Sequence, residues 1–237
     1  MGRAYIPIVR VTDFGPYVTK LVLPLGKKIL SLPEKDSFHV YVERKDQDGN
    51  LLYLPKSWMA RESLQPGRGC ARVRDTYISD REGNRSEEGS SITLELFYGP
   101  MDSITAEFYA PDDHEYSLRS EFRITQLQDF ETEEGTVSGL VFDMRYEVPC
   151  RDYQDFRESV TEGEMPFRYG YFVPQGRQEK KPLIIWLHGA GEGGYETKIA
   201  YMGNKVTAMA SPEIQEVFGG AYLFVPQCET MWMDDGS

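Results

Sequence analysis

The first half of the chain, up to about residue 124, consists of short segments in which apolar and polar residues alternate. Alternation with a period of two is typical of strands that bury one face and expose the other. Clear examples are Tyr17–Leu23, Phe38–Arg44 and Ile92–Tyr98. No helical period of useful length occurs before residue 125. The pattern therefore predicts an antiparallel, β-rich domain.

Polar turns separate these predicted strands. Lys45–Asn50 contains Asp-Gly, which supplies the positive φ that a tight hairpin needs, so we expect a hairpin loop there. Asp80–Asn84 predicts a second such turn or a longer polar loop. About seven short strands with frequent turns favour an immunoglobulin-like β-sandwich over residues 1–126, although the Cys…Trp…Cys pattern of true immunoglobulin domains is missing.

The pattern changes after the acidic, Gly-terminated stretch Gln128–Gly135, which we interpret as a domain boundary. A second domain is expected over residues 127–237. Gly139–Val148 and Phe167–Pro174 predict two further strands. Pro182–Leu187 is a continuous apolar run, which is typical of a strand buried on both faces.

Helical spacing follows this run, from Tyr195 to about Phe218. The residues that carry the spacing are Ile199, Met202, Val206 and Met209. Ser211-Pro212-Glu213 predicts the start of another short helix, with an N-cap, a first-turn proline and an early acid. Gly219-Gly220 ends it, and Ala221–Val225 predicts a second buried strand. The order strand, helices, strand indicates a right-handed crossover in a parallel sheet.

The composition argues against several kinds of binding partner. The net charge of −12 would repel a phosphate backbone, so we expect no nucleic-acid partner. The cysteines Cys70, Cys150 and Cys228 are widely spaced and form no zinc motif, and we expect no metal and no cofactor. No apolar run is long enough for a membrane span, and no leader peptide is recognisable at the start. We expect a soluble, cytoplasmic protein, or a secreted one if a leader has been removed.

The segment from His188 to Gly194 carries the chemistry. Its sequence, His-Gly-Ala-Gly-Glu-Gly-Gly, lies between a predicted strand and a predicted helix. Acyl transfer places negative charge on a carbonyl oxygen, and backbone N–H groups of a glycine-rich loop stabilise that charge. The resemblance described next implies that this segment is an oxyanion-hole loop.

The stretch KPLIIWLHGAGEGG, followed by FVPQC and Trp232, resembles the esterase and depolymerase-like branch of the α/β-hydrolase superfamily. In that branch an immunoglobulin-like domain often precedes the catalytic domain. The resemblance implies a serine-hydrolase-type carboxylic ester hydrolase, with residues 127–237 as the N-terminal portion of the catalytic domain. It further implies that the backbone of Ala190 or Gly191 donates to the oxyanion, and that Gly189 and Gly191 let the loop approach the substrate.

His188 is not expected to be the catalytic base, because in this superfamily the catalytic His follows the nucleophile in the chain. We expect its ring to orient the loop by a hydrogen bond to nearby backbone, and Glu192 to orient the loop as well. Trp232 either lines the substrate cleft or caps the core.

A nucleophile elbow of the form Gly-x-Ser-x-Gly occurs nowhere in the sequence. We therefore expect the catalytic Ser, acid and His to be missing from this chain, and the chain alone to be inactive. The exposed edge of an incomplete parallel sheet would favour homo-oligomers.

Other interpretations remain open. Gly189–Gly194 also fits a dinucleotide-binding fingerprint, although no acidic residue follows at the expected offset to hold a ribose. The β-rich half could act as a carbohydrate- or protein-binding module, and a peptidase of prolyl-oligopeptidase type would use the same loop. We interpret His39 as an exposed strand residue, His114 as part of a solvated acidic loop, and Cys228 as a packed thiol. The expected substrate is a small-molecule or polysaccharide-linked ester, and no membrane partner is expected.

Overall fold

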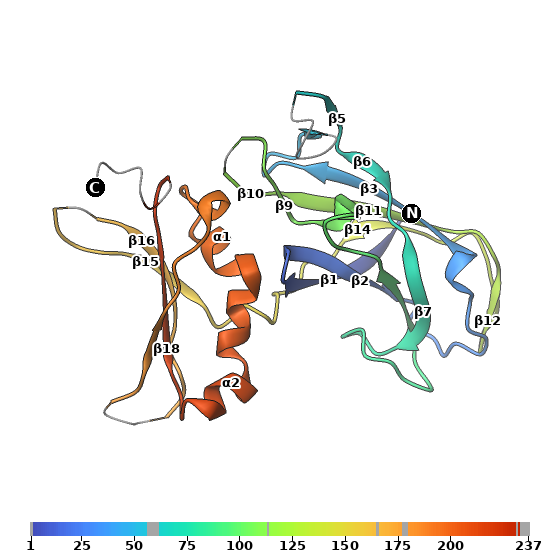
Figure 1. Ribbon diagram of the computed structural model, residues 1–237. Helices are drawn as coiled ribbons and strands as arrows, with labels where there is room; N and C mark the ends of the chain where they lie inside the picture. Colours follow the sequence, from blue (N-terminus) through green and yellow to red (C-terminus); the bar gives the residue numbers. More distant parts are fainter. Residues whose placement is uncertain are drawn as a thin grey trace. The chain divides into compact units, whose positions relative to one another are not determined.

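The computed structural model describes residues 2–55, 62–112, 114–164, 166–176, 180–230 and 232 (Figure 1). The chain divides into two compact units, each made of three segments. Unit 1 contains Met1–Arg10, Tyr17–Glu107 and Leu118–Pro149. Unit 2 contains Val11–Pro16, Phe108–Ser117 and Cys150–Ser237.

Unit 1 is built on one eight-stranded sheet in the order β6-β3-β11-β14-β1-β2-β8-β7. Its strands are β1 (Arg3–Thr12), β2 (Gly15–Pro24), β3 (Phe38–Lys45), β6 (Arg68–Cys70), β7 (Val73–Ser79), β8 (Ser91–Leu96), β11 (Arg119–Gln126) and β14 (Val141–Arg145). Smaller elements are the pairs β4 (Tyr53–Pro55) with β5 (Leu64–Pro66) and β12 (Phe130–Thr132) with β13 (Gly135–Val137), and the 3-10 turns η1 (Lys35–Ser37) and η2 (Ser103–Thr105).

The eight-stranded sheet curls around a single apolar core (Figure 1). Side chains from both ends of the strand order meet in it, among them Val42 on β3, Ile124 on β11, Leu21 on β2 and Leu94 on β8, all fully buried. The sequence predicts two packed sheets, and here the strands β6-β3-β11-β14-β1 and β2-β8-β7 are joined where β1 neighbours β2. The β-rich prediction for this half of the chain is confirmed, since its described helical segments are single 3-10 turns.

Both predicted turns are present. In each, an Asp carboxylate accepts the backbone N–H and the side-chain amide of the Asn four residues later: Asp46 with Asn50, and Asp80 with Asn84. The Gly before each Asn has positive φ, 87° at Gly49 and 78° at Gly83. The antiparallel bridges Lys45↔Leu51 and Ser79↔Arg85 close the two turns.

The predicted boundary between residues 126 and 127 lies inside unit 1. β14, part of the predicted strand Gly139–Val148, pairs with β11 and β1 rather than with the second unit's sheet. Phe142 on β14 is fully buried in the unit 1 core. The acidic stretch around residue 131 is therefore a β12–β13 hairpin, and the contacts change at Cys150.

Unit 2 contains a mixed four-stranded sheet in the order β15-β16-β18-β17. The strands are β15 (Arg157–Val160), β16 (Arg168–Phe172), β17 (Leu183–Ile185) and β18 (Tyr222–Gln227), and the pair β9 (Phe108–Tyr109) with β10 (Tyr116–Ser117) also belongs to this unit. β17 and β18 are parallel, as the sequence predicts, while β15 and β16 are antiparallel to their neighbours.

The helical segments are α1 (Thr197–Met202), η4 (Gly203–Ala210) and α2 (Pro212–Val217), with the 3-10 turn η3 (Ala190–Glu192) before them. Helices α1 and α2 lie on one face of the sheet (Figure 1). The predicted N-cap is confirmed, because the Ser211 hydroxyl accepts the Ile214 N–H. The helical run is broken at Asn204 and Lys205, which adopt left-handed φ of 48° and 54°.

The opposite face of this sheet carries exposed or partly exposed apolar side chains, which we call the aromatic face: Phe167, Tyr169, Tyr171, Leu183, Ile185, Tyr222 and Phe224. Leu183 and Ile185 are 58% and 57% exposed. The prediction that Pro182–Leu187 is buried on both faces is therefore wrong for the described residues, because β17 pairs only with β18 and the helices cover one face.

Among the described residues, no helix combines the length and hydropathy that a membrane span requires.

Candidate active-site loop

The loop from His188 to Gly194 lies at the carboxyl ends of the parallel strands β17 and β18. In open α/β sheets this edge is where ligands bind. The loop is fastened to the end of β18, since Gly194 N–H donates to the Cys228 carbonyl at 2.9 Å and the Gln227 side-chain amide donates to the Glu192 carbonyl at 3.1 Å. The backbone of the loop is thus held from the neighbouring strand.

His188 is 4% exposed and its ring holds the start of the loop. The Cys228 N–H donates to Nε2 at 3.0 Å, so Nε2 carries no proton in this arrangement. Nδ1 lies 2.6 Å from the Gly189 carbonyl oxygen and donates to it. Both ring nitrogens are therefore engaged by backbone groups of the loop and of β18's end.

Trp232 lies against this histidine. The two ring centroids are 4.8 Å apart, and the indole N–H donates to the His188 carbonyl at 2.9 Å. The contacts of Trp232 among the described residues are thus with His188, at the start of the loop. They do not show whether Trp232 also contacts a substrate.

Glu192 is buried and binds the backbone of its own loop. Its Oε2 accepts the Gly189 N–H at 2.5 Å, and its Oε1 accepts the Asn204 side-chain amide at 2.8 Å. A Cβ at Gly189 would lie 2.8 Å from Oε2, so the loop requires glycine there. Asn204, which the sequence did not point to, reaches the carboxylate from a left-handed backbone position.

The amides from Gly189 to Gly194 divide into two groups. Those of Gly189, Glu192, Gly193 and Gly194 donate to acceptors within the protein. Those of Ala190 and Gly191 have no acceptor among the described residues. Ala190 is exposed and Gly191 is partly exposed.

This division weighs against a dinucleotide site. A phosphate cradle needs several free amides leading directly into a helix N-terminus. Here the last three amides of the loop are occupied, and α1 begins only at Thr197.

A second carboxyl group lies beside the loop. Glu115 N–H donates to the Gly191 carbonyl at 2.7 Å, and a Cβ at Gly191 would be 3.5 Å from the Glu115 Cγ. Burial, and to a smaller extent the nearby Glu192, raises the pKa of Glu115 from 4.5 to about 7. The sequence interpretation of this stretch as a solvated acidic loop is thus wrong at Glu115, although Asp112 is exposed; Asp113 lies outside the described residues.

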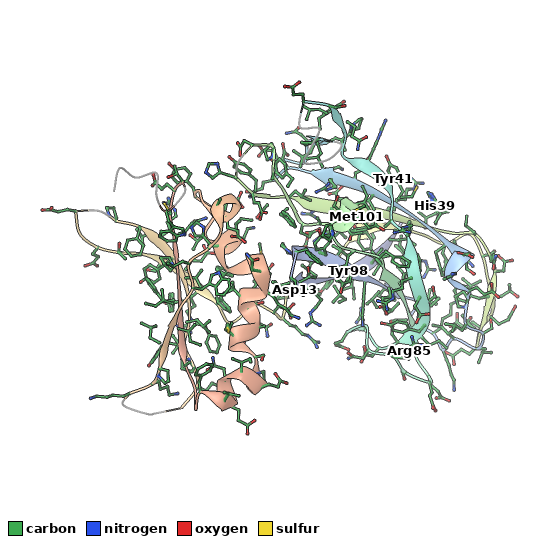
Figure 2. The ribbon with its side chains drawn as sticks, in the orientation of Figure 1. Asp13, His39, Tyr41, Arg85, Tyr98 and Met101 are labelled. Carbon is green, nitrogen blue, oxygen red and sulfur yellow. The ribbon has the colours of Figure 1, made fainter. Side chains whose placement is uncertain are left out.

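The remaining candidates lie elsewhere. His39, on β3 in unit 1, is exposed, and its Nε2 is 3.2 Å from the Cys70 sulfur (Figure 2). Cys228 is partly exposed, and its backbone serves the loop as described above. Within the described part of the chain, no three His, Cys, Asp or Glu side chains come together as a metal site.

Comparison with known proteins gives a family match and a likeness to solved structures. The family described as the esterase Ig-like N-terminal domain matches residues 4–139, more than half of the chain. A solved structure described as the crystal structure of a thermostable esterase is similar, with a TM-score of 0.70 and 20% sequence identity. No curated protein matches the chain.

The structural likeness covers 95% of this chain and 58% of the thermostable esterase chain. At 20% identity it shows a shared fold. The chain therefore spans somewhat more than half the length of the esterase that it resembles.

Proposed function

This chain belongs to the family of the esterase Ig-like N-terminal domain, and on that premise we propose that it forms the front part of a serine-type carboxylic ester hydrolase whose oxyanion-hole loop is residues 188–194. The observation that carries the proposal is the pair of amides at Ala190 and Gly191. They have no acceptor among the described residues, whereas the amides of Gly189 and of Glu192 to Gly194 on either side donate within the protein.

The chemistry follows from this arrangement. When a nucleophile attacks an ester carbonyl, its oxygen becomes negatively charged, and donors already fixed in place stabilise that charge without reorganising. His188, Glu192 and the end of β18 fix the loop before substrate arrives. Ala190 and Gly191 then contribute the donors, and the residue after the nucleophile supplies another.

A proline at position 190 tests the assignment directly. Ala190 is the first residue of η3 and follows an extended Gly189, with φ −77° and ψ 176°. Proline fits such a position, so Ala190→Pro removes one N–H and leaves the loop in place. In a catalytically complete form of the protein we expect kcat/KM for short p-nitrophenyl esters to fall by on the order of 10²–10³.

Ala190→Ser is the matched control, because it changes the side chain and keeps the amide. We expect it to retain most of the activity. Equal activity of the proline and serine variants, with both folded, would exclude the Ala190 amide as an oxyanion donor.

The sequence of residues 1–237 contains no Gly-x-Ser-x-Gly, and we propose that this chain alone has no turnover. We expect no labelling by a fluorophosphonate probe and no ester hydrolysis above background. Covalent labelling of this chain would contradict the proposal. A Gly-x-Ser-x-Gly encoded downstream of Ser237 would support it.

The proposed substrate is a carboxylic ester, either a small molecule or one linked to a polysaccharide. A peptidase of prolyl-oligopeptidase type would use the same amides. Parallel assays on matched ester and anilide substrates separate the two, and we expect turnover of the ester only.

A further inference from the structure

A short hairpin links the N-terminal family sequence to the proposed active-site loop. β9 and β10 lie within residues 4–139, which match the Ig-like N-terminal family, yet Phe108–Ser117 belongs to unit 2. The hairpin contacts the loop at two places: Glu115 N–H donates to the Gly191 carbonyl, and the His114 ring lies 3.9 Å from where a Gly194 Cβ would be. The Ser117 N–H approaches the Glu196 carboxylate at 3.4 Å, just before α1.

The Glu115 side chain packs on the loop as well. Its Cγ and Oε1 would lie 3.5 and 3.6 Å from a Cβ at Gly191, so the carboxyl group covers one side of that residue. No hydrogen bond or ion pair of this carboxyl occurs among the described residues. Gly191 is therefore flanked by the Glu115 backbone and side chain, one residue after Ala190.

We propose that Glu115 is a positioning residue for this loop: its N–H fixes the Gly191 carbonyl, and the charge on its carboxyl group controls how well the Ala190 and Gly191 amides hold a negatively charged oxygen. The inference rests on the proposed function for its catalytic consequence. Its structural consequence can be measured in this chain without catalysis.

The charges around Glu115 set the direction of the effect. Glu192 faces it from the loop, Glu196 lies across from the hairpin next to α1, and Asp112 and His114 lie on the hairpin itself. Asp112 is engaged by the His114 N–H and the Tyr116 hydroxyl. Arg168, from β16, lies over the Tyr195 ring, whose hydroxyl donates to Glu229. Apart from the His114 ring, which lies beside Gly194, the groups around Glu115 are carboxylates, and Glu192 disfavours its ionisation.

The uncharged form of Glu115 consequently favours an oxyanion on the loop, and the ionised form opposes it. Burial raises the pKa of Glu115 to about 7, so the change falls near neutral pH. A like charge a few ångströms away is expected to lower kcat/KM on the order of tenfold as the pH rises through this range.

The first experiment follows the ¹H–¹⁵N resonances of Ala190 and Gly191 in this chain between pH 5 and 9. We expect both amide shifts to titrate with a common midpoint near 7 in the wild type. In Glu115→Gln, which keeps the side-chain volume and removes the charge, the titration should vanish. Glu216→Gln, the same change on the exposed side of α2, should retain it.

Flat amide shifts in the wild type would overturn the proposal without any variant. An unchanged titration in folded Glu115→Gln would also overturn it, since another group would then be responsible.

The second experiment measures kcat/KM for a neutral ester against pH in a catalytically complete form of the protein. We expect Glu115→Gln to lose the decline above pH 7 and to keep the wild-type rate at pH 6, a difference that a merely structural role would not produce. A decline that persists in Glu115→Gln would overturn the catalytic part of the inference. Absence of any esterase activity, with the amide titration present, would refute the proposed function and leave the positioning role of Glu115 standing.

Discussion

The Glu192 carboxylate serves two donors at once, one on each oxygen. Gly189 donates from the backbone and Asn204 from its side chain, and both are fixed by their places in the chain. Hydrogen bonds to a charged, buried acceptor are stronger than neutral ones, and an unpaired partner there is costly. Glu192 therefore couples the shape of the loop to the helical segment that follows it.

Glu192→Gln is expected to destabilise the protein by about 1–3 kcal/mol. The NH₂ group of the glutamine would face either the Gly189 N–H or the Asn204 amide, both of which are donors. Urea unfolding followed by tryptophan fluorescence measures the loss. Glu216→Gln serves as the control and should leave the midpoint unchanged. A Glu192→Gln variant as stable as the wild type would show that water replaces the lost acceptor.

Glu115 should make stability depend on pH. Its pKa is near 4.5 when unfolded and is raised to about 7 in the folded chain, so the folded state binds the proton more tightly. The stabilisation is complete below pH 4.5 and is lost as the pH rises through 7, amounting to as much as about 3 kcal/mol. The unfolding free energy of Glu115→Gln minus that of the wild type should thus be larger at pH 8 than at pH 5. An equal difference at both pH values would contradict the raised pKa.

At the scale of elements, the turn between α1 and the rest of η4 uses two consecutive left-handed residues. Such a conformation costs a non-glycine residue roughly 1 kcal/mol. Asn204 offsets this cost through its bond to Glu192, whereas for Lys205 no side-chain hydrogen bond occurs among the described contacts. The two positions therefore respond differently to glycine.

Lys205→Gly is expected to be neutral or to stabilise the protein by up to about 0.5–1 kcal/mol, since strain relief exceeds or balances the added entropy of the unfolded chain. Asn204→Gly should destabilise it by about 1–2 kcal/mol, because the loss of the hydrogen bond to Glu192 outweighs the relief of backbone strain. Thermal unfolding of the two variants side by side makes the comparison. Equal shifts would mean that the Asn204 side chain contributes nothing.

The elements with a strong local pattern were predictable from the sequence. Strand β3 alternates as predicted, and Ser211-Pro212 marks a helix start. Strands β2 and β8 were predicted as strands, but they are buried on almost every residue and not on one face only. β15 was not predicted, because its four residues are all exposed and carry no apolar alternation. β14 was predicted as a strand, but its assignment to the unit 1 sheet depends on long-range pairing with β1, which no local pattern encodes.

The same distinction applies to the proposed site. His188, Gly189, Ala190, Gly191 and Glu192 are contiguous, so their chemistry is visible in one stretch of sequence. Glu115 and Asn204 reach that stretch only through folding, and Glu115 lies in a polar segment that resembles an ordinary surface loop. The loop could thus be predicted, and its supports could not.

At the scale of the whole molecule, the aromatic face of the unit 2 sheet is the largest departure from the expected burial. Leu183, Ile185 and Tyr222 are between 40% and 58% exposed on it. Contiguous exposed apolar side chains commonly mark surfaces that associate. We expect the isolated chain to form homo-oligomers through this face and the free edge of β17.

Ile185→Lys should shift the isolated chain toward monomer in sedimentation velocity at micromolar concentration. Val217→Lys is the matched control, because Val217 is 77% exposed on α2 and lies outside the aromatic face. A monomeric wild-type chain, or equal effects of the two variants, would contradict this expectation.

The segments of the two units alternate along the sequence, and this affects which parts of the chain recombination can exchange. Unit 2 takes Val11–Pro16 and Phe108–Ser117 from within the N-terminal stretch, so a single recombination point before Cys150 would transfer the β-rich half together with pieces of its neighbour. A foreign half joined there would bring its own residue to the place of Glu115. We expect such an exchange between relatives to keep the contact between Glu115 and Gly191 only when the hairpin and the glycine loop come from the same parent.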